Sequence, residues 1–270
     1  MTEACKKTKD VSNDKLLVET AVSAGEIMLV SGAEIYRVED TVGRILSMEP
    51  GRQAENVALG TSLIVTLDRP GNESLTVMRR IRNRSTNLNR VCRVNEVSRR
   101  LCAGAMGLSE AREALTEIQT ETQYGAWTKA IGYIGVSAFF ALLLGGTWKE
   151  GLGAGIAGAC LAAVCLITAK VRLNDFCVNA LGAFAVGFAA LVIEQWIMPG
   201  MNGNAVITGA IMPLVPGVTF TTAIRDILNG DYSCGTSRMM EALVVALSVA
   251  VGIGTAMTIF GNMAGGGRLQ

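Results

Sequence analysis

Five stretches of this chain contain no charged residue, and that property limits the possible folds more than any other feature of the sequence. The stretches are 130–148, 151–169, 176–193, 195–224 and 242–267. A helix of about 20 apolar residues crosses a bilayer, so each stretch has roughly the length of a span. Hydrophobic residues make up 50% of the chain and charged residues only 17%, which disfavours an ordinary soluble domain. The sequence therefore predicts a mainly α-helical membrane protein with five transmembrane helices.

The charged residues lie mostly before the first of these stretches. Residues 1–129 hold 18 of the 24 Lys and Arg residues. Residues 14–48 show the apolar period of two helices that meet at Ser31 and Gly32. Beyond them "TSLIVTL" and "SLTVMRRI" flank the turn signal "DRPGNE", which predicts a β-hairpin. We expect a small cytoplasmic α/β domain with a helical linker over 1–125, followed by a five-span transmembrane domain over 126–270.

The distribution of Lys and Arg predicts the orientation in the membrane. The first residues, "MTEACKKTKDVSNDK", lack the apolar segment of a signal peptide, so the amino terminus is expected in the cytoplasm. Cytoplasmic loops carry an excess of Lys and Arg, and this orientation places Lys170, Arg172, Arg225 and Arg238 inside. We therefore expect a multi-pass protein of the cell inner (plasma) membrane with its carboxyl terminus outside.

Several kinds of chemistry are disfavoured by composition. The chain has no histidine, and its seven cysteines include no CxxC pair, so a zinc site, a Cys/His nucleophile or a Ser/His/Asp triad is not expected. We predict no metal, no cofactor and no enzymatic activity. Eight arginines between positions 79 and 100 lack interleaved aromatic residues, which favours anionic lipid or the acidic helix that follows over nucleic acid as their partner.

Small residues recur four positions apart in the predicted spans, as in Gly151 with Gly155 and Gly252 with Ala256. This spacing lets helix backbones approach closely in lipid. The seams are expected to pack the chain's own helices together. The alternative is contact with a second copy of the chain in a homo-oligomer.

The fourth stretch is interrupted by prolines, which predicts a broken helix. Pro213 and Pro216 lack the N–H groups that would bond the carbonyls of Gly209 and Met212. Unsatisfied backbone in hydrocarbon costs several kcal/mol, so the break must face protein, water or a ligand. A half-helix starting near Gly217 would add N–H donors and threonine hydroxyls, and such breaks form substrate sites in secondary transporters. A kink satisfied by neighbouring helices is the alternative.

Charged residues follow the break directly. Arg225 is a candidate ligand for a substrate carboxylate, and Asp226 for a proton or an ammonium group. In the alternative interpretation both belong to ion pairs at the end of the span. The predicted substrate-binding residues are Pro213, Pro216, Gly217, Thr219, Thr222, Arg225 and Asp226. A gate or ion-pair group comprises Asp231, Arg238 and Glu241, whereas Asp175 and Glu194 are end-of-span anchors or proton relays.

Two segments of the chain resemble the threonine/serine exporter family. They are "SGAEIYRVED" near the amino end and "PLVPGVTFTTAIRDILNGDYSCGTSRMMEA" around and after the break. The family plan of a cytoplasmic amino-terminal domain and about five spans covers essentially the whole chain. The residues that match the second motif are Pro213, Pro216, Gly217, Arg225, Asp226, Gly230, Gly235 and Arg238.

This resemblance implies export of small hydrophilic metabolites, either amino acids such as threonine and serine or a dicarboxylate such as succinate. Coupling to protons by antiport is implied as well. The chain looks like the larger subunit of a split exporter, which implies a smaller multi-span partner subunit. The rival hypothesis is a membrane sensor or scaffold that does not transport and whose cytoplasmic domain binds a metabolite or a partner.

Overall fold

The computed structural model describes residues 3–49, 51–68, 74–82, 84–171 and 173–264. These residues divide into two compact units. The first unit comprises Met1–Glu121 and Val218–Met239, and the second comprises Thr122–Gly217 and Met240–Gln270. A segment that follows the proline break therefore belongs to the same compact unit as the amino-terminal part of the chain.

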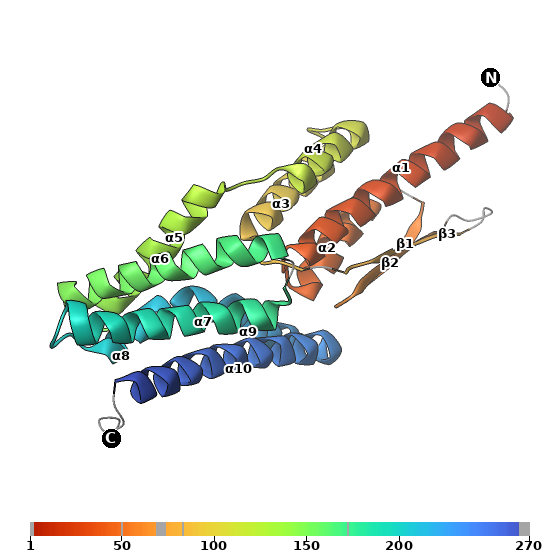
Figure 1. Ribbon diagram of the computed structural model, residues 1–270. Helices are drawn as coiled ribbons and strands as arrows, with labels where there is room; N and C mark the ends of the chain where they lie inside the picture. The colour runs from red at the N-terminus through yellow and green to blue at the C-terminus, as the bar shows by residue number, and fades with distance from the viewer. Residues whose placement is uncertain (1–2, 50, 69–73, 83, 172, 265–270) are drawn as a thin grey trace. The chain divides into compact units, whose positions relative to one another are not determined.

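The first unit contains helices packed on a three-stranded antiparallel sheet. Its elements are α1 (Glu3–Val30), α2 (Ile35–Leu46), β1 (Gln53–Leu59), β2 (Ser62–Asp68), β3 (Leu75–Arg80), α3 (Leu88–Cys102), α4 (Leu108–Thr120), α9 (Gly217–Leu228) and the first two turns of α10 (Tyr232–Met263). The strand order is β1-β2-β3. Leu63, Val65 and Leu67 on β2 are buried, and α1 and α2 pack against the sheet (Figure 1).

The predicted hairpin is confirmed as the pair β2 and β3, in which Leu67 pairs with Leu75. The predicted Pro-Gly turn at 70–71 lies outside the described residues. β1 was not predicted, although "ENVAL" has the alternation of a strand, because its neighbours are polar. Its pairing with β2 runs from Gln53 opposite Asp68 to Leu59 opposite Ser62.

The arginine-rich helix α3 pairs with the acidic helix α4, as the charge pattern predicted. The guanidinium of Arg93 forms an ion pair with Glu121, and Arg100 Nη2 lies 3.9 Å from Glu110 Oε1. Arg90 donates from Nη2 to the backbone carbonyls of Gln119 at 3.1 Å and Glu121 at 2.9 Å, so it caps the end of α4.

The second unit is a bundle of long apolar helices. Its elements are α5 (Ala126–Leu143), α6 (Trp148–Val171), α7 (Asp175–Val192), a π-helical turn η1 (Ile193–Ile197), α8 (Gly203–Ala210), a 3₁₀ turn η2 (Met212–Leu214) and the remainder of α10. Helix α6 packs between α5 and α7, and α8 contacts all three (Figure 1). Large side chains such as Trp127, Phe139 and Leu143 are exposed, as expected for a surface that faces lipid.

Small residues close the seams of this bundle. A Cβ atom on Gly252 of α10 would lie 2.3 Å from the carbonyl oxygen of Ala180 on α7, and one on Gly187 would lie 3.1 Å from Ala256 Cβ. A Cβ atom on Gly209 of α8 would lie 2.6 Å from the backbone nitrogen of Ala141 on α5. The glycines on α8 and α10 therefore pack the chain's own helices, which is the first of the two predicted uses of the small-residue spacing.

Within the described part of the chain, four helices are long and apolar enough to cross a membrane, and the number rises to five if the bent pair formed by α8–η2 and α9 is one broken span. The four are α5, α6, α10 and α7 with its π-helical end. The chain is thus a multi-pass membrane protein with four to five candidate spans and a small sheet.

Candidate functional site

The helix through the fourth apolar stretch is interrupted between Ile211 and Gly217. Helix α8 ends at Ala210, η2 turns the chain, and Val215 has the extended dihedrals φ −68° and ψ 124°. A residue before proline is disfavoured in the α-helical region, which explains why the chain is extended at Val215 before Pro216. A new helix, α9, begins at Gly217. The prolines therefore break the helix as predicted, and the break is a change of backbone conformation rather than a slight curve.

The backbone groups at the break find partners that differ from those expected. The carbonyl of Met212, predicted to lose its partner, accepts from the N–H of Val215 at 3.2 Å, so that part of the prediction is wrong. The 3₁₀ turn instead diverts the N–H of Leu214 to Ile211, 2.8 Å away, and thereby frees the carbonyl of Ala210. The buried hydroxyl of Ser137 on α5 lies 3.4 Å from that carbonyl and donates to it. On its α8 side the break is thus satisfied by a neighbouring helix.

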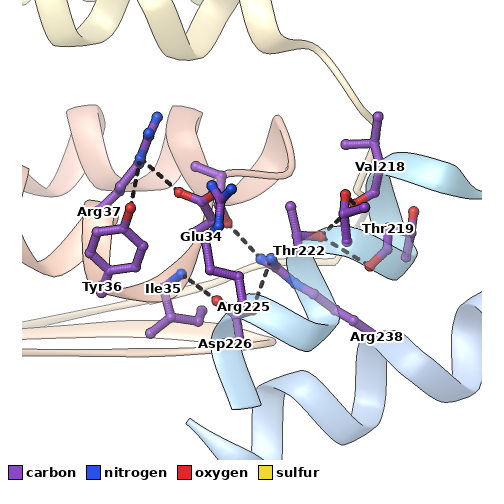
Figure 2. Close-up of polar contacts among 12 residues, drawn as sticks. Glu34, Ile35, Tyr36, Arg37, Val218, Thr219, Thr222, Arg225, Asp226 and Arg238 are labelled. Carbon is purple, nitrogen blue, oxygen red and sulfur yellow. Dashed lines mark hydrogen bonds and ion pairs between the residues drawn. The ribbon is translucent and has the colours of Figure 1, made fainter. Parts of the chain in front are cut away.

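The hydroxyls of Thr221 and Thr222, after the break, bond their own helix. Thr222 Oγ1 donates to the carbonyls of Val218 at 2.9 Å and Thr219 at 3.0 Å (Figure 2). Thr221 Oγ1 donates to the carbonyl of Val218 at 3.0 Å. Such back-bonding occupies the hydroxyl hydrogens and leaves the oxygens as acceptors. Gly217 has open space around the position of a Cβ atom.

The segment "SGAEIYRVED", the first of the two that resemble the exporter family, forms a tight corner between α1 and α2. Gly32 has a φ of +82°, and the N–H groups of Gly32 and Ala33 bond the carbonyls of Leu29 at 3.2 Å and Met28 at 3.0 Å. This is the Schellman arrangement, in which a glycine in the left-handed region ends a helix. Helix α2 then starts at Ile35 after the N-cap residue Glu34, whose side chain makes no capping bond. The corner therefore leaves a helix N-terminus that needs an acceptor from elsewhere.

The segment around and after the break, the second of the two that resemble the exporter family, forms the same kind of corner between α9 and α10. Gly230 has a φ of +95°, and the N–H groups of Gly230 and Asp231 bond the carbonyls of Ile227 at 3.0 Å and Asp226 at 2.9 Å. Helix α10 returns closely along α9, because a Cβ atom on Gly235 would lie 2.8 Å from the carbonyl oxygen of Ala223. This close return brings Arg238 of α10 beside Asp226 of α9.

The two corners meet within the first unit (Figure 2). Asp226 Oδ1 accepts from the N–H of Ile35 at 3.1 Å and so supplies the missing cap of α2. Asp226 Oδ2 lies 3.0 Å from Arg238 Nη1, and Arg238 Nη2 donates to the carbonyl of Ala33 at 2.7 Å. The Asp226–Arg238 pair therefore joins the α9–α10 corner to the α1–α2 corner through backbone atoms.

A second group of charges borders this pair. Glu34 uses both carboxylate oxygens, since Oε1 pairs with the guanidinium of Arg225 and Oε2 lies 2.7 Å from Arg37 Nε. Arg37 also donates from Nε to the hydroxyl of Tyr36 at 3.2 Å, and this hydrogen bond is the main cause that raises the pKa of Arg37. We refer to Glu34, Arg37, Arg225, Asp226 and Arg238 as the corner cluster.

Burial divides the corner cluster into two parts. The side chains of Asp226 and Arg238 are 0% and 4% exposed, whereas Arg225 is 55% exposed although its partner Glu34 is only 8% exposed. Removing one partner of a buried pair leaves an uncompensated charge, so Asp226 and Arg238 hold structure. Arg225 and Arg37 both pair with Glu34 through side chains that are about half exposed, and of these two arginines Arg225 is the one on α9, the helix that follows the break.

The remaining predicted residues are placed differently. Asp231 contributes its backbone to the α9–α10 corner, and Glu241 is exposed on α10. Asp175 is exposed in the first turn of α7. Glu194 lies in the π-helical turn with its carboxylate against Gly203, 2.0 Å from the position of a Cβ atom there, at the start of α8. Pro213 and Pro216 make the break and are half-buried.

Glu34, Ile35 and Arg37 were not predicted as site residues. The signal was present, because "SGAEIYRVED" carries part of the family resemblance, but nothing in its spacing names a distant partner. Ile35 and Asp226 are 191 positions apart. Among the described residues, no group of three or more His, Cys, Asp or Glu side chains is placed to hold a metal ion.

Comparison with known proteins matches the sequence of this chain to a protein family. The sequence model described as "Putative threonine/serine exporter" covers residues 19–260, which include both corners. A "Probable threonine/serine exporter" of Mycobacterium tuberculosis is 23% identical over 249 residues, which cover 90% of this chain and 46% of that protein. The chain thus spans about half the length of that relative.

Two relatives have nearly the length of this chain. "Probable succinate transporter subunit YjjP" of Escherichia coli K12 is 23% identical over 256 residues, which cover 92% of this chain and 96% of that protein. The protein of the same name in Klebsiella aerogenes is 22% identical over 259 residues, 93% and 97% of the two chains. No solved structure matches the chain. With a family match over residues 19–260, the chain belongs to the threonine/serine exporter family, a family of membrane transporters.

Proposed function

We propose that the chain is one subunit of a secondary exporter that moves small hydrophilic metabolites bearing a carboxylate out of the cytoplasm. The solute is threonine, serine or a dicarboxylate such as succinate, and export is coupled to proton entry by antiport. The amino-terminal domain lies in the cytoplasm, the membrane is the inner (plasma) membrane, and the carboxyl terminus lies outside. The proposed boundary between the two domains is near residue 125.

The main observation in support of this proposal is Arg225, whose side chain is 55% exposed, on α9, the helix that starts at the proline break. Arg225 lies eight residues after Gly217, which is about 12 Å of helix at the usual rise of about 1.5 Å per residue. Guanidinium groups bind carboxylates in fixed geometry and stay charged at any physiological pH. A carboxylate that reaches α9 therefore meets a permanent positive charge, about 12 Å along the helix from the residue at which α9 starts.

A partner subunit supports the same proposal. The E. coli and K. aerogenes relatives carry the word "subunit" in their names and are matched over nearly their whole length. The M. tuberculosis relative is matched over 46% of its length, so it holds further sequence beyond the part that this chain resembles. We propose that a smaller multi-span protein supplies the missing part to this chain, and that lipid surrounds both.

Export from cells tests the proposal. The chain and the proposed smaller multi-span subunit are expressed separately and together, and extracellular threonine, serine and succinate are measured. At least one of them should accumulate outside only when both proteins are present. The same extracellular levels with and without the chain, for all three solutes, would point to the sensor or scaffold instead.

The break has its own test in the double variant Pro216→Ala with Gly217→Leu. Restoring the N–H at 216 and a strong helix former at 217 favours a continuous helix, and the open space at Gly217 accepts a side chain. We expect export to be abolished while the amount of protein in the membrane is unchanged. Full export by this variant would contradict a role for the break in transport.

A further inference from the structure

The corner cluster contains a carboxylate that occupies the group proposed to bind substrate. Glu34 is buried, comes from the α1–α2 corner, and pairs through Oε1 with Arg225, which is more than half exposed. An arginine on an open surface does not need a buried partner, because water solvates it well. The Glu34 carboxylate therefore occupies Arg225 in the way that the carboxylate of a bound solute would.

Glu34 also has a second partner that stays available. Its Oε2 lies 2.7 Å from Arg37 Nε, on the same first turn of α2. If Arg225 leaves, the buried carboxylate keeps one guanidinium and avoids the cost of a buried charge without a partner. Arg225 can therefore exchange Glu34 for another carboxylate.

The rest of the cluster keeps its geometry during such an exchange. Asp226 and Arg238 bond the backbone of Ile35 and Ala33, on either side of Glu34, so both corners stay joined. Arg225 precedes Asp226 in α9, and its side chain is exposed whereas those of Asp226 and Arg238 are buried. Only the Glu34–Arg225 contact has to open.

Resting on the proposed function, we propose that Glu34 is an internal competitor that the carboxylate of the exported solute displaces from Arg225, and that Arg37 receives Glu34 when this happens. The apparent affinity for the solute equals the intrinsic affinity multiplied by the fraction of protein in which Arg225 is free of Glu34. Glu34 thereby sets how much solute must accumulate in the cytoplasm before the site fills. Glu34, from the segment "SGAEIYRVED", thus controls access of the solute to Arg225 in the segment after the break.

Equilibrium binding of labelled succinate, threonine and serine to the full chain in detergent, at low ionic strength, tests this competition. Glu34→Gln should bind the solute about fivefold more tightly than the wild type, the gain expected when a pair worth about 1 kcal/mol is removed. Arg225→Gln should lose binding. Arg37→Gln should weaken binding, because Glu34 is then left with Arg225 alone.

The double variant Glu34→Gln with Arg37→Gln separates displacement from a general change of charge. If Arg37 acts through Glu34, its substitution has no effect once Glu34 is neutral. A general field effect would weaken binding by the same factor in both backgrounds. The matched control is Asp40→Asn, which removes a negative charge from the same helix at an exposed pair with Arg44.

Unchanged or weaker binding by Glu34→Gln, or an equal effect of Arg37→Gln in both backgrounds, overturns the proposal. So does a Glu34→Gln protein that folds and binds none of the three solutes. If Glu34→Gln does not fold, Glu34→Asp keeps the charge but shortens its reach and should still bind more tightly than the wild type. Export is measured separately. If the variants bind the solute with the predicted order of affinities but the chain and its partner export none of the three solutes, the proposed function is contradicted and the competition between Glu34 and the solute is still supported.

Discussion

At the scale of single residues, the corner cluster contains arginines with different tasks. Arg238 is almost fully buried, forms an ion pair with Asp226 and donates to a backbone carbonyl, whereas Arg225 is half exposed. The sequence grouped Arg225 with Asp226 because they are adjacent. The structure associates Asp226 with Arg238 instead, since a close helical return places the two side chains together.

The buried pair predicts a large effect on stability. Arg238→Gln leaves the Asp226 carboxylate without its charged partner, and breaking a buried pair in this way costs about 3–5 kcal/mol. Arg44→Gln, at the exposed pair with Asp40, should leave the melting temperature almost unchanged. Thermal unfolding in detergent compares the two, and equal melting temperatures would show that the Asp226–Arg238 pair does not hold the corners together.

At the scale of elements, glycines determine how closely helices approach. Gly32 was predicted as a turn between two helices, and it has the left-handed conformation that favours glycine at a helix end. The helix end at Gly230 was not predicted, although it has the same conformation. The proline break was also predicted from local sequence, because proline lacks the N–H group that a continuous helix needs. The pairing of backbone groups at the break was not, because Ser137 lies on another helix and no sequence period links it to Ala210.

Gly235 offers the sharpest element-scale prediction. A Cβ atom there would lie 2.8 Å from the carbonyl oxygen of Ala223 and 3.0 Å from the nitrogen of Ile227, both of which are backbone atoms of α9. Gly235→Val should push α10 away, move Arg238 from Asp226 and destabilise the protein by at least about 1–3 kcal/mol. Gly254→Ala on the same helix meets open space and serves as the control. Unchanged thermal stability of Gly235→Val would contradict the close packing of α9 and α10.

The bonded carbonyl at the break gives a smaller effect. Ser137→Ala removes the donor to the Ala210 carbonyl, and a hydrogen bond between membrane helices is worth about 0.6 kcal/mol on average. We expect a slight loss of thermal stability, with protein levels in the membrane maintained. A loss of several kcal/mol would mean that the hydroxyl does more than satisfy one carbonyl.

At the scale of the whole molecule, the sequence predicted the classes of element and left the long-range contacts open. Uncharged stretches predicted the apolar helices, and alternation predicted the β2–β3 hairpin, because both are local patterns. The start of α10 at Tyr232 lies ten residues before the predicted 242, since its first turns are polar and belong to the corner. The meeting of the two corners depends on tertiary packing, which periodicity does not encode.

In the proposed function, Arg225 is the group that binds the solute's carboxylate. Its most direct test is the rate of efflux of labelled threonine, serine and succinate from proteoliposomes that contain the chain and its partner, with Arg225→Gln compared against Arg44→Gln. We predict efflux of at least one solute from the wild type and from Arg44→Gln, and a loss of at least about tenfold in Arg225→Gln, the cost of a charged hydrogen bond of about 1.5–3 kcal/mol. Efflux from Arg225→Gln at the wild-type rate would contradict the account.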